Sequence, residues 1–201
     1  MTMAHRKGLD PSSHDYHVRQ RGSQVQLIAY CTYTCTLWAL KVYWLFFYQR
    51  LGEGVDHMRF KIKLGFVFVG ATFIANIAAI FMSCMPVHKY WQIYPNPGIS
   101  CQIALSKVQS YVSLFTNQLT DFYIMSIPLP MVWSARIPLA RKFLLMSMFC
   151  GGLINAVVGI IRVAFCLLGR TDSGGWSCRE LFIATFITNI PVMYAPLYKL
   201  L

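Results

Sequence analysis

Acidic residues are scarce in this chain, which has 7 Asp and Glu against 18 Lys and Arg, and charged residues of both signs make up only 12% of it. Because an ordinary soluble domain is about one quarter charged, this scarcity argues against a soluble globular protein. Hydrophobic residues form 56% of the chain, and the mean hydropathy is +0.49. The cations lie mostly between apolar runs of about 18 residues or more, which is the pattern of membrane-protein loops and not of a nucleic-acid-binding patch. The partner that the composition predicts is therefore a lipid bilayer.

Recognisable catalytic and metal-binding patterns are also missing. No His lies within a long apolar stretch, and the sequence has no HExxH, CxxC or Ser/His/Asp pattern. An enzyme needs convergent catalytic groups, so an enzyme is the class that we expect least, and we assign no catalytic, metal-binding or cofactor-binding residue. The spacing of His5, His14 and His17 could suggest a metal site, but no second group of ligands lies nearby, and a solvated tail is the favoured interpretation.

Five apolar stretches are long enough to cross a hydrocarbon core of ~30 Å as helices, which requires about 20 residues each. We predict an all-α fold, a polytopic transmembrane helix bundle formed by residues 25–201. Residues 1–24 are expected to be a polar tail or loop, because they contain no apolar segment typical of a signal peptide. The predicted spans are residues 25–48, 64–83, 108–133, 143–168 and 181–200.

The stretch 108–133 is the one around which the others are organised, because it contains a single charge, Asp121. An ionised carboxylate at the bilayer centre costs about 2.5 to 3.5 kcal/mol unless it meets a partner or water. Most polar residues of this helix fall on one side, which should therefore face protein. The residues on that side are Ser110, Ser113, Asn117, Thr120 and Asp121.

Two arrangements are predicted for Asp121. Depth is counted at about 1.5 Å per residue from the span ends that loop charge assigns to the cytoplasm. On this count Lys41 lies about 10 Å deep, Asp121 about 18 Å and Arg162 about 30 Å. Lys41 is thus the nearer cation and can pair with Asp121, although it can also extend to the interface. In the other arrangement, burial keeps Asp121 protonated, with Asn117 one turn away as hydrogen-bond partner.

Other predicted spans also carry polar groups. In 143–168, Gly151, Asn155, Gly159 and Arg162 share one face, where Arg162 can either extend outward or reach a carboxylate. The span 181–200 carries Asn189. The candidate intramembrane polar residues are Lys41, Asn117, Asp121, Asn155, Arg162 and Asn189.

Loop charge and cysteine positions predict the topology. The loop between the first two spans and the loop between the third and fourth are the most basic, so we expect both to be cytoplasmic and the N-terminal segment outside. Four cations in residues 1–24 oppose that rule. Cys84, Cys101 and Cys178 fall at or in the loops assigned outside, where an oxidising environment favours a disulfide between Cys84 and Cys101. The alternative is that these are unpaired thiols. The cations of the two basic loops are Arg50, Arg59, Lys61, Lys63, Arg136, Arg141 and Lys142.

Several short motifs follow one another in a recognisable order. They are KVYWLFFYQRL from Lys41, Cys84-Met-Pro86 with Trp91 and Cys101, Asn117 with Asp121, Pro128-Leu-Pro130, Lys142 with Gly151-Gly152 and Arg162, and Trp176 with Glu180 and Pro191. From residue 25 to the C-terminus, the chain resembles the fungal rhodopsin-domain integral membrane proteins, GPCR-like seven-helix proteins that include the Pth-type receptors and the satratoxin-cluster membrane proteins. The resemblance implies that the five spans correspond to helices three to seven and that the first two helices are missing, as in a truncated gene model. Retinal is not implied, since a Schiff-base lysine would lie in the middle of the last helix, whereas Lys199 lies at its end.

Three interpretations of function stay open. The first is a receptor-like sensor without retinal in the plasma membrane, with an extracellular small-molecule ligand and a cytoplasmic signalling partner. The second is a small-molecule transporter or a channel-like protein, which is less favoured because the sequence has no inverted repeat of broken helices. The third is a truncated fragment without function, because loss of two helices would expose polar faces meant for a bundle interior.

Overall fold

The computed structural model of the protein describes residues 14–51, 56–92, 98, 101–102, 106–128, 139–168 and 173–200. These residues form five α-helices and one short 3-10 helix, and no strand occurs among them. The all-α prediction is therefore confirmed. The elements are α1 (His14–Leu51), α2 (Asp56–Met82), η2 (Val87–Tyr90), α3 (Lys107–Ser126), α5 (Leu139–Leu167) and α6 (Ser173–Leu200).

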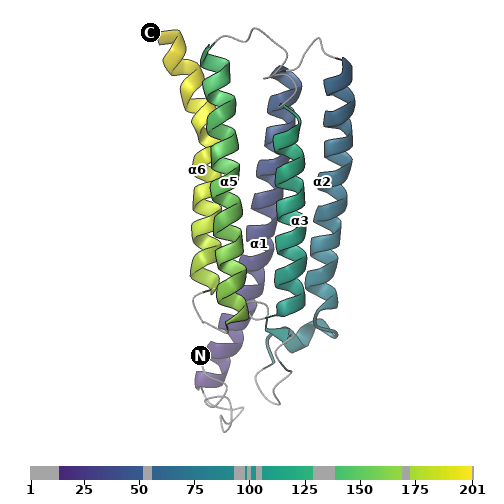
Figure 1. Cartoon of the computed structure of the whole chain (residues 1–201). Helices are drawn as coiled ribbons and strands as arrows, with labels where there is room; N and C mark the ends of the chain where they lie inside the picture. Colours follow the sequence, from purple (N-terminus) through teal and green to yellow (C-terminus); the bar gives the residue numbers. More distant parts are fainter. Residues whose placement is uncertain are drawn as a thin grey trace.

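The five α-helices run up and down along one common direction and form an elongated bundle (Figure 1). Helix α1 packs against α2, α3 and α6, while α5 packs against α3 and α6. The helices thus form a closed ring in chain order, and α1 reaches across it to α3. The start of α1 and the end of α6 lie at opposite ends of the bundle (Figure 1).

Most helices extend beyond the apolar stretches that predicted them. Helix α1 begins at His14, so residues 14–24, expected to be a tail or loop, are helical. Helix α2 begins at Asp56 and includes cations expected in a loop, and α5 likewise includes Arg141 and Lys142. Hydropathy marks only the apolar part of a helix, whereas backbone hydrogen bonding continues wherever polar side chains can reach solvent.

Helix α3 is shorter than predicted and ends at Ser126. Pro128 follows closely and has no N–H to continue the helical hydrogen bonds. The predicted continuation to Trp133, with Pro130, lies outside the described residues. His5 and Arg136 lie outside them as well.

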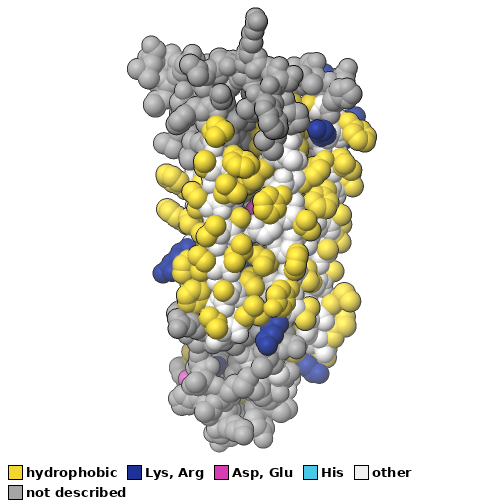
Figure 2. All heavy atoms as spheres, viewed as in Figure 1, with side chains coloured by type: hydrophobic (Ala, Val, Ile, Leu, Met, Phe, Trp, Pro, Cys, Tyr) yellow, Lys and Arg dark blue, Asp and Glu magenta, His cyan; other side chains and the backbone are white. Residues whose placement is uncertain are grey.

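Buried polar side chains lie inside the bundle beside an apolar core, and large apolar side chains cover its outside, which is clearest in α3. The predicted polar face of α3 points into the protein, and its outward face is apolar (Figure 2). Large apolar side chains are likewise exposed on α2, α5 and α6. An apolar exterior of this extent suits contact with lipid. The buried residues of α3 are Gln109, Ser110, Ser113, Asn117, Thr120 and Ile124, and its exposed apolar residues are Val108, Tyr111, Phe115, Leu119 and Phe122.

Length and hydropathy alone identify one candidate membrane span among the described residues, Met58–Met82, with a mean hydropathy of 2.2. Within α5, the described stretch Phe149–Phe165 is also apolar. Interior polar side chains lower the mean hydropathy of α3, although its 20 residues would extend over ~30 Å. The crossing of the bilayer by all five helices therefore stays a prediction.

A disulfide closes one end of the bundle, hereafter the disulfide end. Cys84 and Cys101 are joined by an S–S bond of 2.01 Å, which confirms the predicted pair. Tyr90 packs beside them and donates its hydroxyl to the backbone carbonyl of Ile80. Burial, with Cys31 and Tyr30 nearby, raises the pKa of Tyr90, so its phenol stays a neutral donor. The disulfide therefore holds η2 onto the end of α2.

Removal of this disulfide is expected to lower stability. The bond closes a loop with a sequence separation of 17, and closing a loop of that size contributes about 3 kcal/mol. Replacing Cys84 and Cys101 by alanine should therefore lower the melting temperature of the purified protein in detergent. The matched control is Cys150→Ala, because Cys150 is an exposed free thiol. Equal melting temperatures for the double variant and the control would contradict this prediction.

Candidate functional site

The first part of the site is an ion pair between Lys41 of α1 and Asp121 of α3. The ammonium of Lys41 donates to Asp121 Oδ1 and also to the backbone carbonyl of Asn117 at 3.2 Å. Lys41 is only 4% exposed, so it does not extend to the interface. The structure thus contains the first of the two arrangements predicted for Asp121.

Asn155 brings a third helix to this carboxylate. Its Nδ2 donates from α5 to Asp121 Oδ2 at 3.3 Å. Both oxygens of Asp121 therefore accept hydrogen bonds, one from a charged donor and one from an amide. The pair can be retained inside an apolar bundle because its hydrogen-bonding capacity is largely used.

A second ion pair joins Arg162 of α5 to Glu180 of α6. Arg162 Nε donates to Glu180 Oε2 at 2.7 Å, and the Tyr33 hydroxyl donates to the same oxygen at 2.7 Å. Arg162 also donates from Nη2 to Ser113 Oγ at 3.4 Å. Glu180 is completely buried and Arg162 is 4% exposed, so this pair is sealed from solvent.

Sequence reasoning missed Glu180 because the last span was expected to begin at residue 181, which left Asp121 as the one acid within a span. Helix α6 begins at Ser173, so Glu180 lies inside it. The signal that could have found it was Arg162, a cation in an apolar stretch that needed a carboxylate at the same level. Of the two outcomes predicted for Arg162, the structure contains the contact with a carboxylate.

Asn117 connects the two ion pairs. Its backbone carbonyl accepts from Lys41, and its side-chain Nδ2 donates to Glu180 Oε1 at 3.3 Å. Charged groups from α1, α3, α5 and α6 thus form one continuous hydrogen-bonded network, hereafter the polar network. Of the six candidate polar residues, five belong to it, and Asn189 does not. Asn189 is exposed and donates to the backbone carbonyl of Thr185.

A separate polar contact joins α2 to α3. Asn76 is fully buried and donates from Nδ2 to Thr116 Oγ1 at 2.8 Å, while Gln109 Nε2 donates to Asn76 Oδ1 at 3.2 Å. These residues carry no net charge. They hold α2 against α3 and lie apart from the ion pairs.

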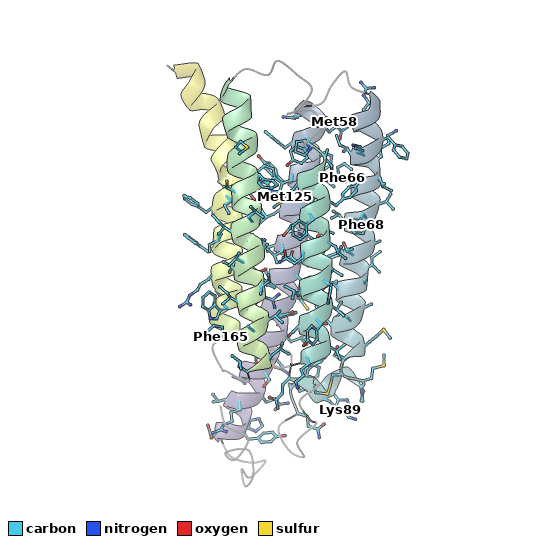
Figure 3. All side chains as sticks on the ribbon, in the orientation of Figure 1. Met58, Phe66, Phe68, Lys89, Met125 and Phe165 are labelled. Atoms are coloured by element: carbon cyan, nitrogen blue, oxygen red, sulfur yellow. A yellow bond between two sulfur atoms is a disulfide. The ribbon has the colours of Figure 1, made fainter. Side chains whose placement is uncertain are left out.

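A cavity of about 70 Å³ lies beside the Lys41–Asp121 pair, lined by residues of α1, α3, α5 and α6. By this measure one water needs about 10 to 15 Å³, so the cavity has room for several waters or one small molecule. Gly151 and Gly152 form part of its wall. A Cβ atom at Gly152 would meet the end of the Met125 side chain, which lies on the side of α3 facing α5 (Figure 3). The polar residues of the lining are Lys41, Asn117, Asp121, Asn155 and Thr188.

Two carbonyl oxygens of residues that line the cavity have no hydrogen-bond partner in the described part of the chain. They are Oδ1 of Asn117 and Oδ1 of Asn155, and both are buried. Each of these amides uses its Nδ2 on a carboxylate. Buried acceptors are rarely left without a partner, so both atoms are candidates for contact with a ligand or water.

The arrangement suits reversible binding. Each interior charge among the described residues has an opposite charge beside it, and two residues of the mainly apolar cavity wall carry neutral acceptors without a partner. A binding pocket of this kind, apolar with a few polar groups, is typical of small-molecule sites. Within the described ranges, no group of three or more His, Cys, Asp or Glu side chains is placed to hold a metal ion.

Comparison with family models places the chain in a known family. A family model described as the fungal rhodopsin domain matches residues 1–199. The match includes every residue of the polar network and of the cavity lining. No curated protein and no solved structure matches the chain.

Proposed function

Because the chain belongs to the fungal rhodopsin domain family, we propose that it is a multi-pass, receptor-like protein of the plasma membrane that binds a small molecule inside its helix bundle. It acts without retinal and without catalysis. All five helices cross the bilayer, and a signalling partner contacts the cytoplasmic end.

The observation that carries the proposal is the polar network beside the cavity. Two ion pairs are buried in a bundle whose exterior is apolar, an arrangement that is costly in a membrane and usually marks a functional interior. The network reaches the cavity through Lys41 and Asp121. A ligand in the cavity therefore contacts groups that hold α1, α3 and α5 together.

The shared residue Asn117 supplies a means of transmission. A ligand that moves Asn117 changes the hydrogen bonds of both ion pairs, and these pairs position α5 and α6 against α1 and α3. A ligand shifts a conformational equilibrium only by its differential affinity for the two states, so contact with the network is what makes such a shift effective. Displacement of interface helices by an ångström or two is a common form of response.

The opposite end of the bundle from the disulfide is basic, and we refer to it as the basic end. Arg50 lies in the last turn of α1, and α2 exposes Arg59, Lys61 and Lys63 in its first turns. Such a surface suits anionic lipid headgroups and the acidic surface of a signalling partner. We place this end in the cytoplasm and the disulfide end outside.

The proposed topology predicts a labelling pattern. Single cysteines at Lys61 and Lys89 are introduced into a background in which the five cysteines outside the Cys84–Cys101 disulfide are serine, and intact cells are treated with a membrane-impermeant maleimide. Lys89→Cys, at the disulfide end (Figure 3), should be labelled on intact cells, whereas Lys61→Cys should react only after permeabilisation. Labelling of Lys61→Cys on intact cells would reverse the topology. The five replaced cysteines are Cys31, Cys35, Cys150, Cys166 and Cys178.

The receptor interpretation is tested by reconstitution. The protein in lipid nanodiscs is incubated with a cytoplasmic G-protein fraction and screened with a panel of small molecules, and the same panel is tested for flux in liposomes. We expect compound-dependent recruitment that is lost in Asp121→Asn, with no flux. Flux of a compound without recruitment would favour the transporter interpretation instead.

A further inference from the structure

We infer that the ligand of the interior cavity is a small neutral molecule, apolar over most of its surface, that carries a hydroxyl or amide N–H as hydrogen-bond donor. This inference rests on the proposed function, because it names the class of ligand for the proposed site. Three observations carry it: the pairing of the charges, the unpartnered carbonyl oxygens and the composition of the wall.

The pairing of charges selects against a charged ligand. Among the described residues, Lys41 and Asp121 are the two charged residues in the cavity lining, and they are bonded to each other. The nearest further charges, Arg162 and Glu180, are paired and sealed. A cationic ligand at Asp121 would lie beside the ammonium of Lys41, and an anionic ligand at Lys41 would lie beside a carboxylate. Either ligand would lose its hydration and gain a like charge nearby, so a neutral ligand is favoured.

The two carbonyl oxygens select for a donor. Asn117 donates through Nδ2 to Glu180, and Asn155 donates through Nδ2 to Asp121. Turning either amide over would aim its carbonyl at a carboxylate, so the contacts fix both orientations. Oδ1 of each residue is thereby left as an acceptor without a partner among the described residues. A ligand that donates a hydrogen bond satisfies a group that the protein itself leaves open.

The rest of the wall sets the size and the apolar character of the ligand. Trp44, Tyr48, Ile124 and Ile187 line the cavity together with the end of Met125. A volume of about 70 Å³ corresponds to roughly five waters by the measure of ~10 to 15 Å³ each. A compact aromatic or branched aliphatic alcohol is of this order, whereas a large polyene or peptide is not.

The test uses four probes of one shape: benzyl alcohol, toluene, benzylamine and benzoate. The full-length protein is prepared in nanodiscs with ¹³C-methyl methionine, and the Met125 methyl signal is assigned with Met125→Leu. Benzyl alcohol should shift the Met125 signal saturably. Toluene, which lacks the donor, should bind about tenfold more weakly, since loss of one buried hydrogen bond corresponds to roughly that factor. The charged probes should give no saturable shift.

Partition of the probes into lipid is controlled within the same spectrum. Met82 is 70% exposed on the outer surface of α2, so its methyl signal reports the bilayer and should change linearly with concentration. A saturable shift confined to Met125 thus reports the cavity. Equal affinity for toluene and benzyl alcohol would overturn the requirement for a donor, and saturable binding of benzylamine or benzoate would overturn neutrality.

A matched pair of glycine variants confirms the location. Gly152→Val should abolish the saturable shift, because the new side chain meets Met125 and fills the cavity wall. Gly70→Val is the control, since a Cβ at Gly70 has no atom within 4 Å. Binding that survives in Gly152→Val would place the ligand elsewhere and overturn the inference. Failure of every probe would also overturn it, while recruitment of the G-protein fraction by another class of compound would leave the proposed function intact.

Discussion

Glu180→Gln is expected to lower the free energy of unfolding by about 3 to 5 kcal/mol, the usual cost of breaking a buried ion pair by removing one partner. The substitution keeps the shape of the side chain but leaves the guanidinium of Arg162 without its carboxylate in a sealed site. Tyr33 and Asn117 donate to different oxygens of the Glu180 carboxylate, so glutamine can accept from only one of them in this geometry, and the other hydrogen bond is lost together with the charge. Unfolding of the purified protein by a denaturing detergent, followed by far-ultraviolet circular dichroism, measures the change.

A second substitution separates loss of the pair from general damage. Adding Arg162→Met to Glu180→Gln should recover much of the stability, because no buried charge is then left unpaired. Arg179→Met is the control: Arg179 precedes Glu180 in α6, is exposed, and lies over the ring of Trp176, with its guanidinium carbon 4.7 Å from the ring centroid. Its effect should stay within about 0.5 kcal/mol, as for most surface substitutions. Equal stability of Glu180→Gln and Arg179→Met would contradict the buried pair.

Asp121→Asn is expected to lower the free energy of unfolding by roughly 1 to 3 kcal/mol, which is the cost of leaving a buried polar group without its partner. The loss is smaller than for Glu180 because the Asp121 side chain is 15% exposed and lines the cavity, where water can solvate the unpaired Lys41. Adding Lys41→Met should restore part of the stability.

The same series distinguishes an ionised from a protonated Asp121. If Asp121 were neutral, the change to asparagine would be nearly silent, because an amide replaces a carboxylic acid of similar shape. If Asp121→Asn is destabilised and adding Lys41→Met recovers none of the stability, both arrangements are rejected. Thr32→Val serves as the control, since Thr32 is exposed on α1, its hydroxyl donates to the backbone carbonyl of Ile28, and it belongs to neither ion pair.

Sequence reasoning could predict the features that follow from helical periodicity and depth. The polar face of α3 follows from spacing at 100° per residue, and it is the buried face. Depth along the helices favoured Lys41 over Arg162 as the partner of Asp121, and the structure contains that pair. Loop placement predicted the bond between Cys84 and Cys101.

The rest depends on where helices end and how their side chains meet. Glu180 was placed outside the last span because the apolar stretch begins only at residue 181. Helix α6 already starts at Ser173, seven residues before Glu180. The cavity could not be predicted, since it arises from contacts between four helices and from the absence of side chains at Gly151 and Gly152. The open carbonyl oxygens of Asn117 and Asn155 depend on side-chain orientations that a sequence does not specify.

The central claim, that all five helices cross a bilayer with the polar network inside, is tested most directly by spin labels on the apolar exterior. One cysteine per helix is labelled in vesicles, at Phe46, Ile74, Leu119, Ile160 and Phe186, all of them exposed. Collisions with dissolved oxygen and with a water-soluble nickel complex are then measured, with a label at exposed Arg50 as the aqueous control. The account predicts that all five labels are relaxed by oxygen and shielded from nickel. Nickel access at Leu119, Ile160 or Phe186 equal to that at Arg50 would contradict it.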